Sequence, residues 1–343
     1  MKSKDEPLYS YADIAGFLRK SVAVFLILFS FAGFAVSARA VQARRLDEMD
    51  PVLDSVPAPA AQRPSLRLAN PETLSPAETV RGVESLVSVK KVGKCKDGSI
   101  EVDIAVDPVD GTELIAKGLD NSISVLAVGP KGSLLHAPDM YMEKLVSGPE
   151  GVGILNIDAP IEENVKNLAK ALNKDVQDIV VAILERERHE DIINRVRKTG
   201  AKVKLFKAGD IVNAINTCFS ESGTHMMAGI GGAPEGVIAA AAIKGLRGFF
   251  QARLKPYSEE EKERCKKMGI DDVNHILEME DLVKGDEITF VATGVTNGDI
   301  LRGVVKMPDG KMRTHSLAIR AKTGTVRFID TIHCIDKAQN IIV

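Results

Sequence analysis

Two aspartates, Asp107 and Asp110, follow a stretch whose pattern predicts a buried strand. Val102, Ile104 and Val106 alternate with other residues along this stretch, and such alternation is typical of a strand. The two carboxylates are three positions apart, just where the predicted strand gives way to the next element. Carboxylates held at a strand end could bind a hard cation.

The residues around the two aspartates predict how the strand ends. Pro108 cannot donate to a sheet ladder, so the strand is expected to stop there. Gly111 allows a tight turn, and Thr112 is placed to cap a helix that runs toward Lys117. Both carboxylates then face the space beyond the sheet edge, where they would form a hard-oxygen site suited to Mg²⁺ or Mn²⁺. An aspartate-rich turn is the alternative interpretation.

A glycine-rich stretch, Gly229-Ile-Gly-Gly-Ala-Pro-Glu-Gly236, is the second candidate site. It joins a predicted strand to a helix predicted over Val237–Leu246, and backbone N–H groups at a helix start suit an anion. Glu235 could add a third carboxylate to a metal site. The glycine spacing does not match a dinucleotide-binding fingerprint. Alternatively, the small residues only allow the helix to pack closely.

Two further stretches could contact a ligand. Arg186-Glu187-Arg188-His189 follows a predicted strand, and its arginines could hold a phosphate bidentately. A solvated helix start is the alternative. Tyr141, in a predicted loop over 136–145, could offer a hydroxyl and a flat face to a ligand, although burial in the core would explain it equally.

Composition excludes some classes of partner. The 343 residues carry a formal net charge of -2, aromatic residues make up only 4%, and Trp is absent. The chain therefore has neither the basic field nor the stacking platforms that nucleic-acid binding requires. The four cysteines have no metal-ligand spacing, which favours buried thiols over a zinc site or a disulfide framework.

The amino-terminal segment predicts membrane targeting. Ser21–Ala38 carries no charge and follows Arg19-Lys20, and Ala38-Arg39-Ala40 has the form of a cleavage site. A cleaved signal and an uncleaved anchor both suit this pattern, and a buried soluble helix is the alternative. A secretory membrane and a plastid are both compatible destinations. A reporter that stays in the cytosol when fused to Met1–Gln62 would contradict membrane targeting.

The chain divides by composition into three parts. Residues 1–40 form the signal or transmembrane segment, 41–85 a proline-rich tether, and 86–336 the main domain. The main domain alternates strands and helices, which predicts a layered α/β fold. Strands are predicted over 123–128, 179–184, 203–206, 226–230, 287–293, 301–306, 313–319 and 326–333. Helices are predicted over 161–172, 191–198, 211–219, 237–246 and 258–268, the last capped by Ser258.

Three stretches together resemble one family. DIAVDPVDGT, LAVGPKGSLLHAPDMYMEKLVSGP and GIGGAPEGV closely resemble the class II fructose-1,6-bisphosphatases, whose cyanobacterial members also act on sedoheptulose-1,7-bisphosphate. The similarity runs in order from about Lys91 to His333. It implies the layered α/β sandwich of the metal-dependent sugar-phosphatase superfamily, assembled as dimers or tetramers. The implied reaction is Mn²⁺- or Mg²⁺-dependent hydrolysis of the 1-phosphate of fructose-1,6-bisphosphate, in gluconeogenesis or the Calvin cycle.

The resemblance also implies roles for individual residues. Asp107, Asp110 and Glu235 would be the metal ligands and the catalytic residues. The residues implied to contact the sugar bisphosphate are Asp110, Gly111, Thr112, Tyr141, Arg186, Glu187, Arg188, Gly209, Asp210 and Gly232.

Two departures from the family pattern are visible. Ala208 stands where the family usually has an acid, which predicts weaker recognition of a sugar hydroxyl. Met1–Lys90 does not match the family's amino-terminal portion, which supplies a helix with a Lys and an Asp and a further metal ligand. Two alternatives to a competent phosphatase follow. One is a catalytically impaired, membrane-tethered protein that binds sugar phosphates or has a regulatory role. The other is a family domain joined to a foreign amino-terminal segment.

Overall fold

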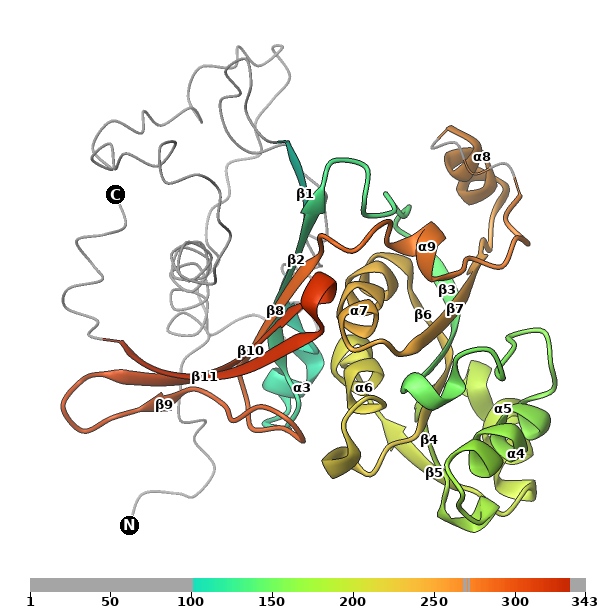
Figure 1. Cartoon of the computed structure of the whole chain (residues 1–343), viewed down its shortest axis with the longest axis horizontal. Coiled ribbons are helices and arrows are strands. Elements are labelled where there is room, and N and C mark those ends of the chain that lie inside the picture. The colour runs from blue at the N-terminus through green and yellow to red at the C-terminus, as the bar shows by residue number, and fades with distance from the viewer. Residues whose placement is uncertain (1–100, 268–269, 271, 334–343) are drawn as a thin grey trace, which may run out of the picture. The chain divides into compact units, whose positions relative to one another are not determined.

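The computed structural model describes residues 101–333 except 268–269 and 271 (Figure 1). Of the described residues, those in 101–305 and 313–331 form one compact unit, and those in 306–312 and 332–333 are assigned to a second. The predicted membrane segment and the predicted tether lie outside the described residues. Within the described part of the chain, no helix is long and apolar enough to cross a membrane.

In the first sheet, the three strand pairs named below are antiparallel. Its strands are, in order, β1 (Val102–Asp110), β2 (Ile123–Pro130), β8 (Thr289–Gly294), β10 (Met312–Arg320) and β11 (Thr325–His333), and β9 (Val305–Lys306) pairs with β10. β2 pairs with β1 on one side and with β8 on the other, and β8 pairs with β10. The central position of β2 explains why seven of its eight residues are buried.

The second sheet is mixed. Its strands are, in order, β5 (Lys202–Phe206), β4 (Val180–Leu184), β6 (Met226–Gly232), β3 (Tyr141–Ser147) and β7 (Phe249–Lys255). β4 runs parallel to both of its neighbours, whereas β3 runs antiparallel to β6 and β7. The start of β3 therefore lies beside the end of β6.

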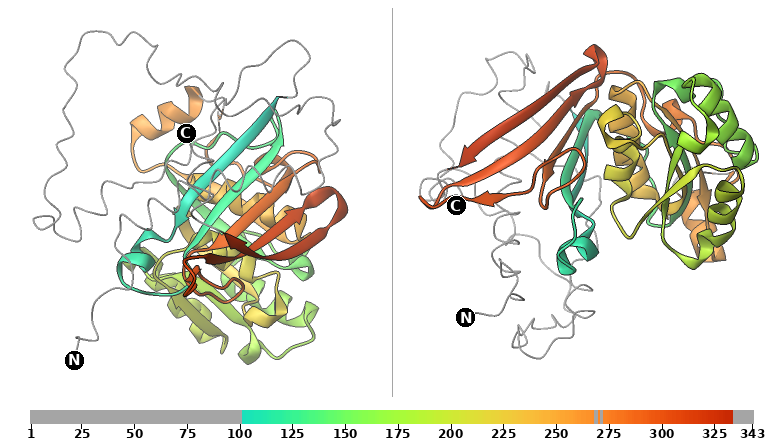
Figure 2. Two further views of the ribbon diagram at one scale, coloured as in Figure 1. Left: turned by 90° about the vertical axis from the view of Figure 1, so that its left-hand side faces the viewer. Right: turned by 90° about the horizontal axis from the view of Figure 1, so that it is seen from below.

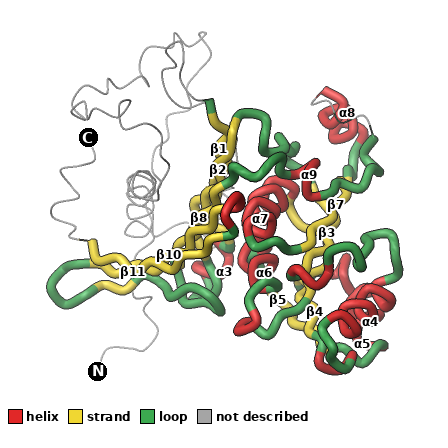
Figure 3. The backbone as a smooth tube through the Cα atoms, in the orientation of Figure 1, coloured by secondary structure: helices red, strands yellow, loops and turns green. Residues whose placement is uncertain are grey.

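Helices lie on both faces of the second sheet. The helices are α3 (Thr112–Ala116), α4 (Ile161–Ala171), α5 (Glu190–Lys198), α6 (Asp210–Asn216), α7 (Ala233–Gly245), α8 (Glu259–Lys267) and α9 (Met279–Leu282). α6 and α7 lie between the two sheets, and α4 and α5 cover the other face of the second sheet (Figures 1, 2 and 3). The predicted mixed α/β class is confirmed.

α7 is buried because it is apolar on all sides. The run Ala239–Ala242 is at most 2% exposed, and α7 contacts strands of both sheets. A helix without a polar face must be surrounded by protein, and alanine lets backbones on both sides approach closely. The main core cluster accordingly joins α7 to Phe290 of the first sheet and Phe250 of the second.

A second core lies beneath α4 and α5. Ile161, Val165 and Leu168 recur along one face of α4 and pack with Val196 of α5 and Ile183 of β4. This spacing is the amphipathic pattern from which the helix over 161–172 was predicted, and the prediction is confirmed.

The predicted end of the first strand was wrong. β1 continues through Pro108 to Asp110, and its pairing with β2 shifts register between Asp107 and Asp110. An irregular pairing leaves Pro108 at a position that needs no ladder donor. Thr112 does not cap the next helix: Gly111 occupies the cap position with φ 79°, and no side chain caps it.

Other element boundaries also differ from the predictions. The helix predicted from Val237 begins at Ala233, because Pro234 is tolerated in a first helical turn. Tyr141 does not lie in a loop; it opens β3. The strand β7 was not predicted, and the strand predicted over 301–306 is reduced to β9. Ser258 does cap α8, since its Oγ accepts a hydrogen bond from the Glu261 N–H at 3.2 Å.

Candidate active site

Asp107 and Asp110 lie buried at the irregular end of β1. Their exposed fractions are 4% and 5%. Asp107 Oδ1 accepts a hydrogen bond from the Val109 N–H at 2.9 Å, and Asp110 Oδ2 accepts one from the Ile211 N–H at 3.2 Å. The Ser122 hydroxyl donates to the Asp110 carbonyl at 2.9 Å. Asp110 thus links the end of β1 to the start of α6.

Burial of these carboxylates changes their acidity. Burial raises the pKa of Asp107 to about 6, the Val109 N–H opposes the rise, and the charge of Glu235 adds to it. The pKa of Asp110 lies well above its usual range, through burial first and then the charges of Asp107, Asp210 and Glu235. Four carboxylates from three segments therefore lie close enough to repel one another. Such repulsion favours either a bound proton or a bound cation.

The start of α6 places Asp210 beside the end of β1. Gly209 precedes it at φ 89°, a left-handed conformation that glycine adopts without strain. Asp210 Oδ2 lies 2.6 Å from Nζ of Lys144, which is 2% exposed. Gly111 and Gly209 are close neighbours, because a Cβ at Gly111 would lie 3.7 Å from the Gly209 nitrogen.

The start of α7 folds the Glu235 carboxylate back onto Gly232. A Cβ at Gly232 would lie 1.9 Å from Glu235 Oε2, so a side chain there would displace the Glu235 carboxylate. Burial raises the pKa of Glu235, and the Lys144 ammonium opposes this rise. Glu235 lies in the first turn of α7, where the helix dipole favours a negative charge.

The loop after β4 carries Arg186, Glu187 and Arg188. Arg186 pairs with Glu113 of α3 at 3.2 Å and donates to the Lys207 carbonyl at 2.9 Å. These contacts hold the loop against the start of α3 and the approach to α6.

Arg188 connects the same loop to both β6 and β3. It donates to the Ile230 carbonyl at 2.8 Å, and its Cζ lies 4.8 Å from the centroid of the Tyr141 ring. The Tyr141 side chain is 41% exposed and packs edge-on against Tyr257, with ring centroids 5.6 Å apart. The tyrosine is therefore not a core residue; the face of its ring supports the arginine, and the side chain is partly open to solvent.

His189 anchors this loop from beneath. It is 2% exposed, and its Nε2 accepts a hydrogen bond from the Ile230 N–H at 2.7 Å. Nδ1 therefore carries the proton and donates to the Leu184 carbonyl at 2.7 Å. Burial lowers the pKa of His189, which favours the neutral ring that these two hydrogen bonds require. Gly229 leaves room for it, because a Cβ there would lie 3.1 Å from Nε2.

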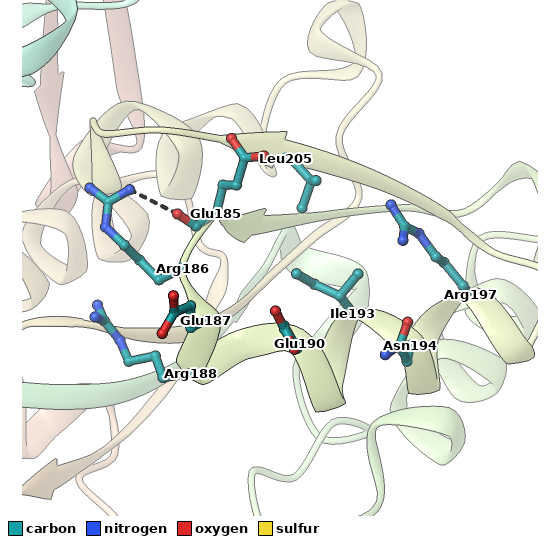
Figure 4. Close-up of a pocket in the computed structure, with 9 residues that line it drawn as sticks. All are labelled: Glu185, Arg186, Glu187, Arg188, Glu190, Ile193, Asn194, Arg197 and Leu205. Carbon is teal, nitrogen blue, oxygen red and sulfur yellow. Dashed lines mark hydrogen bonds between the residues drawn. The ribbon is translucent and has the colours of Figure 1, made fainter.

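A cavity of about 890 Å³ opens beside the arginine loop. Its lining residues are Glu185, Arg186, Glu187, Arg188, Glu190, Ile193, Asn194, Arg197 and Leu205. Figure 4 shows Arg186 and Arg188 extending to the same side of the loop, with Arg197 reaching in from α5 at the other end. None of the three predicted metal ligands is among the residues that line this cavity.

Contacts link the six segments that carry the predicted residues. The end of β1, the starts of α3, α6 and α7, the loop after β4 and the start of β3 meet through the contacts above. No three Asp, Glu, His or Cys side chains among the described residues are gathered at metal-binding distance. Sequence reasoning missed Lys144 and gave His189 no role. One signal in the sequence could have found Lys144: it is a charged residue two positions from the apolar Met142 and Val146, with which it shares one face of a strand.

Comparison with known proteins identifies the family. Residues 78–333 match the model of the bacterial fructose-1,6-bisphosphatase family encoded by glpX. The chain is 45% identical over 252 residues to a D-fructose 1,6-bisphosphatase class 2/sedoheptulose 1,7-bisphosphatase of Synechococcus sp. (strain JA-2-3B'a(2-13)), covering 70% of this chain and 72% of that protein.

Two further relatives agree. Identity is 42% to the fructose-1,6-bisphosphatase class 2 of Haemophilus influenzae, over 70% of this chain and 76% of that protein. Identity is 40% to the D-fructose 1,6-bisphosphatase class 2/sedoheptulose 1,7-bisphosphatase of Gloeobacter violaceus, over 71% of this chain and 74% of that protein. The match begins at residue 78, before the start near Lys91 that the motifs indicated. The resemblance read from the three motifs is confirmed: the chain belongs to the family of class II, glpX-encoded fructose-1,6-bisphosphatases.

Proposed function

We propose that this chain hydrolyses fructose-1,6-bisphosphate to fructose 6-phosphate and phosphate with the help of a divalent cation. One observation carries the proposal: in a chain of this family, the buried carboxylates of Asp107 and Asp110 at the end of β1 lie within electrostatic range of Glu235 of α7, and the neighbouring α3 pairs with a loop that bears two arginines. The fold we infer is the layered α/β sandwich of the metal-dependent sugar phosphatases. Sedoheptulose-1,7-bisphosphate is a second candidate substrate, because two of the relatives bear both names.

Asp107, Asp110 and Glu235 would hold the cation. Their oxygens are the hard donors that Mn²⁺ and Mg²⁺ prefer. Burial first, and repulsion from neighbouring carboxylates second, raise the pKa values of Asp107 and Asp110, which supports neutralisation of these groups by a proton or a cation. When bound, the cation would neutralise charge that develops on the phosphoryl oxygens and help to activate water.

The chain's own residues would orient the substrate. The guanidinium groups of Arg186 and Arg188 would bind a phosphate with charged hydrogen bonds. Tyr141, which is partly exposed, would hold Arg188 in place and contact the sugar. Gly111 and Gly209 allow two helix starts to approach each other closely. Phosphoryl transfer depends mainly on such positioning and charge stabilisation.

Phosphate release is the test of the proposed reaction. The purified chain with Mn²⁺ should release phosphate from fructose-1,6-bisphosphate, and EDTA should abolish the release. A parallel titration should show that the sugar bisphosphate binds. Binding without hydrolysis would instead favour the impaired, sugar-phosphate-binding protein. The absence of both binding and hydrolysis would refute the proposal.

The affinity for metal should depend on pH. Since the pKa of Asp107 is raised to about 6, this carboxyl holds a proton below that pH, and the pKa of Asp110 is raised as well. Mn²⁺ must displace these protons. We expect the apparent Mn²⁺ affinity to fall by roughly tenfold per pH unit for each proton displaced, and therefore by roughly a hundredfold per pH unit below 6, where both Asp107 and Asp110 hold a proton. Calorimetry between pH 5 and 8 would measure this, and a pH-independent affinity would contradict it.

A further inference from the structure

Lys144 is a buried cation in the middle of an apolar row. It lies on β3 between Met142 and Val146, which belong to the core on the α6 and α7 side of the sheet. Its side chain is 2% exposed. A charge in such surroundings requires partners, because burial in a medium of low polarity penalises the ionised form.

The partners of Lys144 come from two different helix starts. Its Nζ lies 2.6 Å from Asp210 Oδ2 at the start of α6, and it donates to the Gly232 carbonyl, 3.0 Å away, directly before α7. Both helix starts carry residues of the candidate active site. A single ammonium group therefore ties together two segments that approach the site from different parts of the chain.

The glycine-rich run makes the room for this arrangement. A Cβ at Gly231 would lie 1.7 Å from Asp210 Oδ2 and 2.8 Å from Lys144 Nζ, and a Cβ at Gly236 would lie 3.4 Å from Lys144 Cδ. Lys144 stands opposite Gly229 in the register of β3 and β6. Gly231 and Gly236 therefore leave space for the Lys144–Asp210 ion pair that lies beside them.

We propose that Lys144 is a positioning residue that fixes the Asp210 carboxylate for contact with the sugar bisphosphate. The proposal rests on the proposed function and on the contact with the sugar bisphosphate that the family resemblance implies for Asp210. Without the ammonium group, the Asp210 carboxylate would be repelled by Asp110 and Glu235, whose charges act on the same region. Lys144 opposes this repulsion and sets the direction of the carboxylate through a charged hydrogen bond.

A positioning role and a purely structural role predict different results. Removal of one partner of a buried ion pair destabilises the fold, whereas replacement of both partners by neutral groups of similar size often does not. If Lys144 only stabilised the core, Lys144→Met would lower thermal stability but leave the substrate affinity of the folded protein close to that of the wild type. If Lys144 positions Asp210, affinity should fall even where thermal stability is retained.

The test combines single and double variants with a matched control. Lys144→Met should weaken binding of fructose-1,6-bisphosphate and raise KM by about tenfold or more, with a smaller change in kcat and little change in Mn²⁺ affinity. Lys204→Met, which removes the lysine of another pair at 2.6 Å, with Asp299, should leave KM unchanged. The double variant Lys144→Met/Asp210→Asn should bind no more weakly than Asp210→Asn alone, because both changes remove the same contact.

The outcomes separate this inference from the proposed function. A wild-type chain that neither binds nor hydrolyses the sugar bisphosphate overturns both. Wild-type activity with an unchanged KM in Lys144→Met, or with losses that add fully in the double variant, overturns the inference alone. If Lys144→Met does not fold, Lys144→Gln, which can still donate toward Gly232, carries the same comparison.

Discussion

Replacement of Asp107 by asparagine should lower phosphate release from fructose-1,6-bisphosphate by roughly 10²- to 10³-fold. The change removes one of the oxygen charges that would hold the divalent cation, and a cation of this kind contributes several kcal/mol to charge stabilisation in a transition state, where each ~1.4 kcal/mol is a factor of ten. Asn is nearly isosteric with Asp and can still accept the hydrogen bond that Asp107 takes from Val109, so the fold should be retained.

Substrate binding should survive this change better than turnover. The arginine loop that would anchor a phosphate is separate from Asp107, whereas transition-state stabilisation needs the full set of carboxylates. Calorimetry should show that Asp107→Asn weakens Mn²⁺ binding strongly. Asp178→Asn, a change at an exposed aspartate paired only with Lys202, is the control and should match the wild type. Equal Mn²⁺ affinity in Asp107→Asn and the wild type would remove Asp107 from the set of ligands.

Replacement of Arg188 by methionine should raise KM for the sugar bisphosphate by about 10- to 100-fold. Hydrogen bonds to a charged group contribute about 1.5–3 kcal/mol each, and Met keeps the length of the side chain without the guanidinium. Arg188 stacks on Tyr141 and donates to the Ile230 carbonyl, which holds its fork in a fixed direction. Arg188→Lys keeps the charge but not the forked guanidinium, so its KM should lie between those of the wild type and Arg188→Met.

The matched control for Arg188 lies in the same cavity. Arg197 lines its far end and comes from α5 (Figure 4). Arg197→Met changes the net charge by the same amount as Arg188→Met. It should leave KM within about twofold of the wild type, because Arg197 is a surface residue of α5 outside the loop that bears Arg186 and Arg188. Equal effects of the two substitutions on KM would show that the general positive potential, and not the direction of Arg188, determines binding.

Local sequence patterns were sufficient for most of the secondary structure. The period-2 alternation of Val102, Ile104 and Val106 predicted β1, and the helical spacing of Ile161, Val165 and Leu168 predicted α4. These patterns succeed because the side chains of one element must share a buried face. The predictions failed where a boundary depends on a neighbour. Pro108 lies inside β1 because the pairing with β2 shifts register beside it, and the sequence of β1 alone does not contain that shift.

The sequence by itself also determined the family and the candidate residues. The motifs around Asp107, Tyr141 and Glu235 carried the resemblance, and the types of these residues already indicated chemistry with a cation and a phosphate. Motifs have this power because each keeps a short run of side chains in a fixed local geometry, whatever the rest of the chain does.

Only the tertiary structure decided how these residues meet. Asp110 contacts the start of α6 through Ile211, a residue about 100 positions away, and Lys144 reaches both Asp210 and Gly232. Long-range contacts of this kind follow from the order of strands in two sheets. The same packing decides that Lys144 is buried and that the Asp107 carboxyl has a raised pKa. Burial and mutual repulsion depend on the three-dimensional distance between charges, and that distance is set by packing and cannot be read from spacing along the chain.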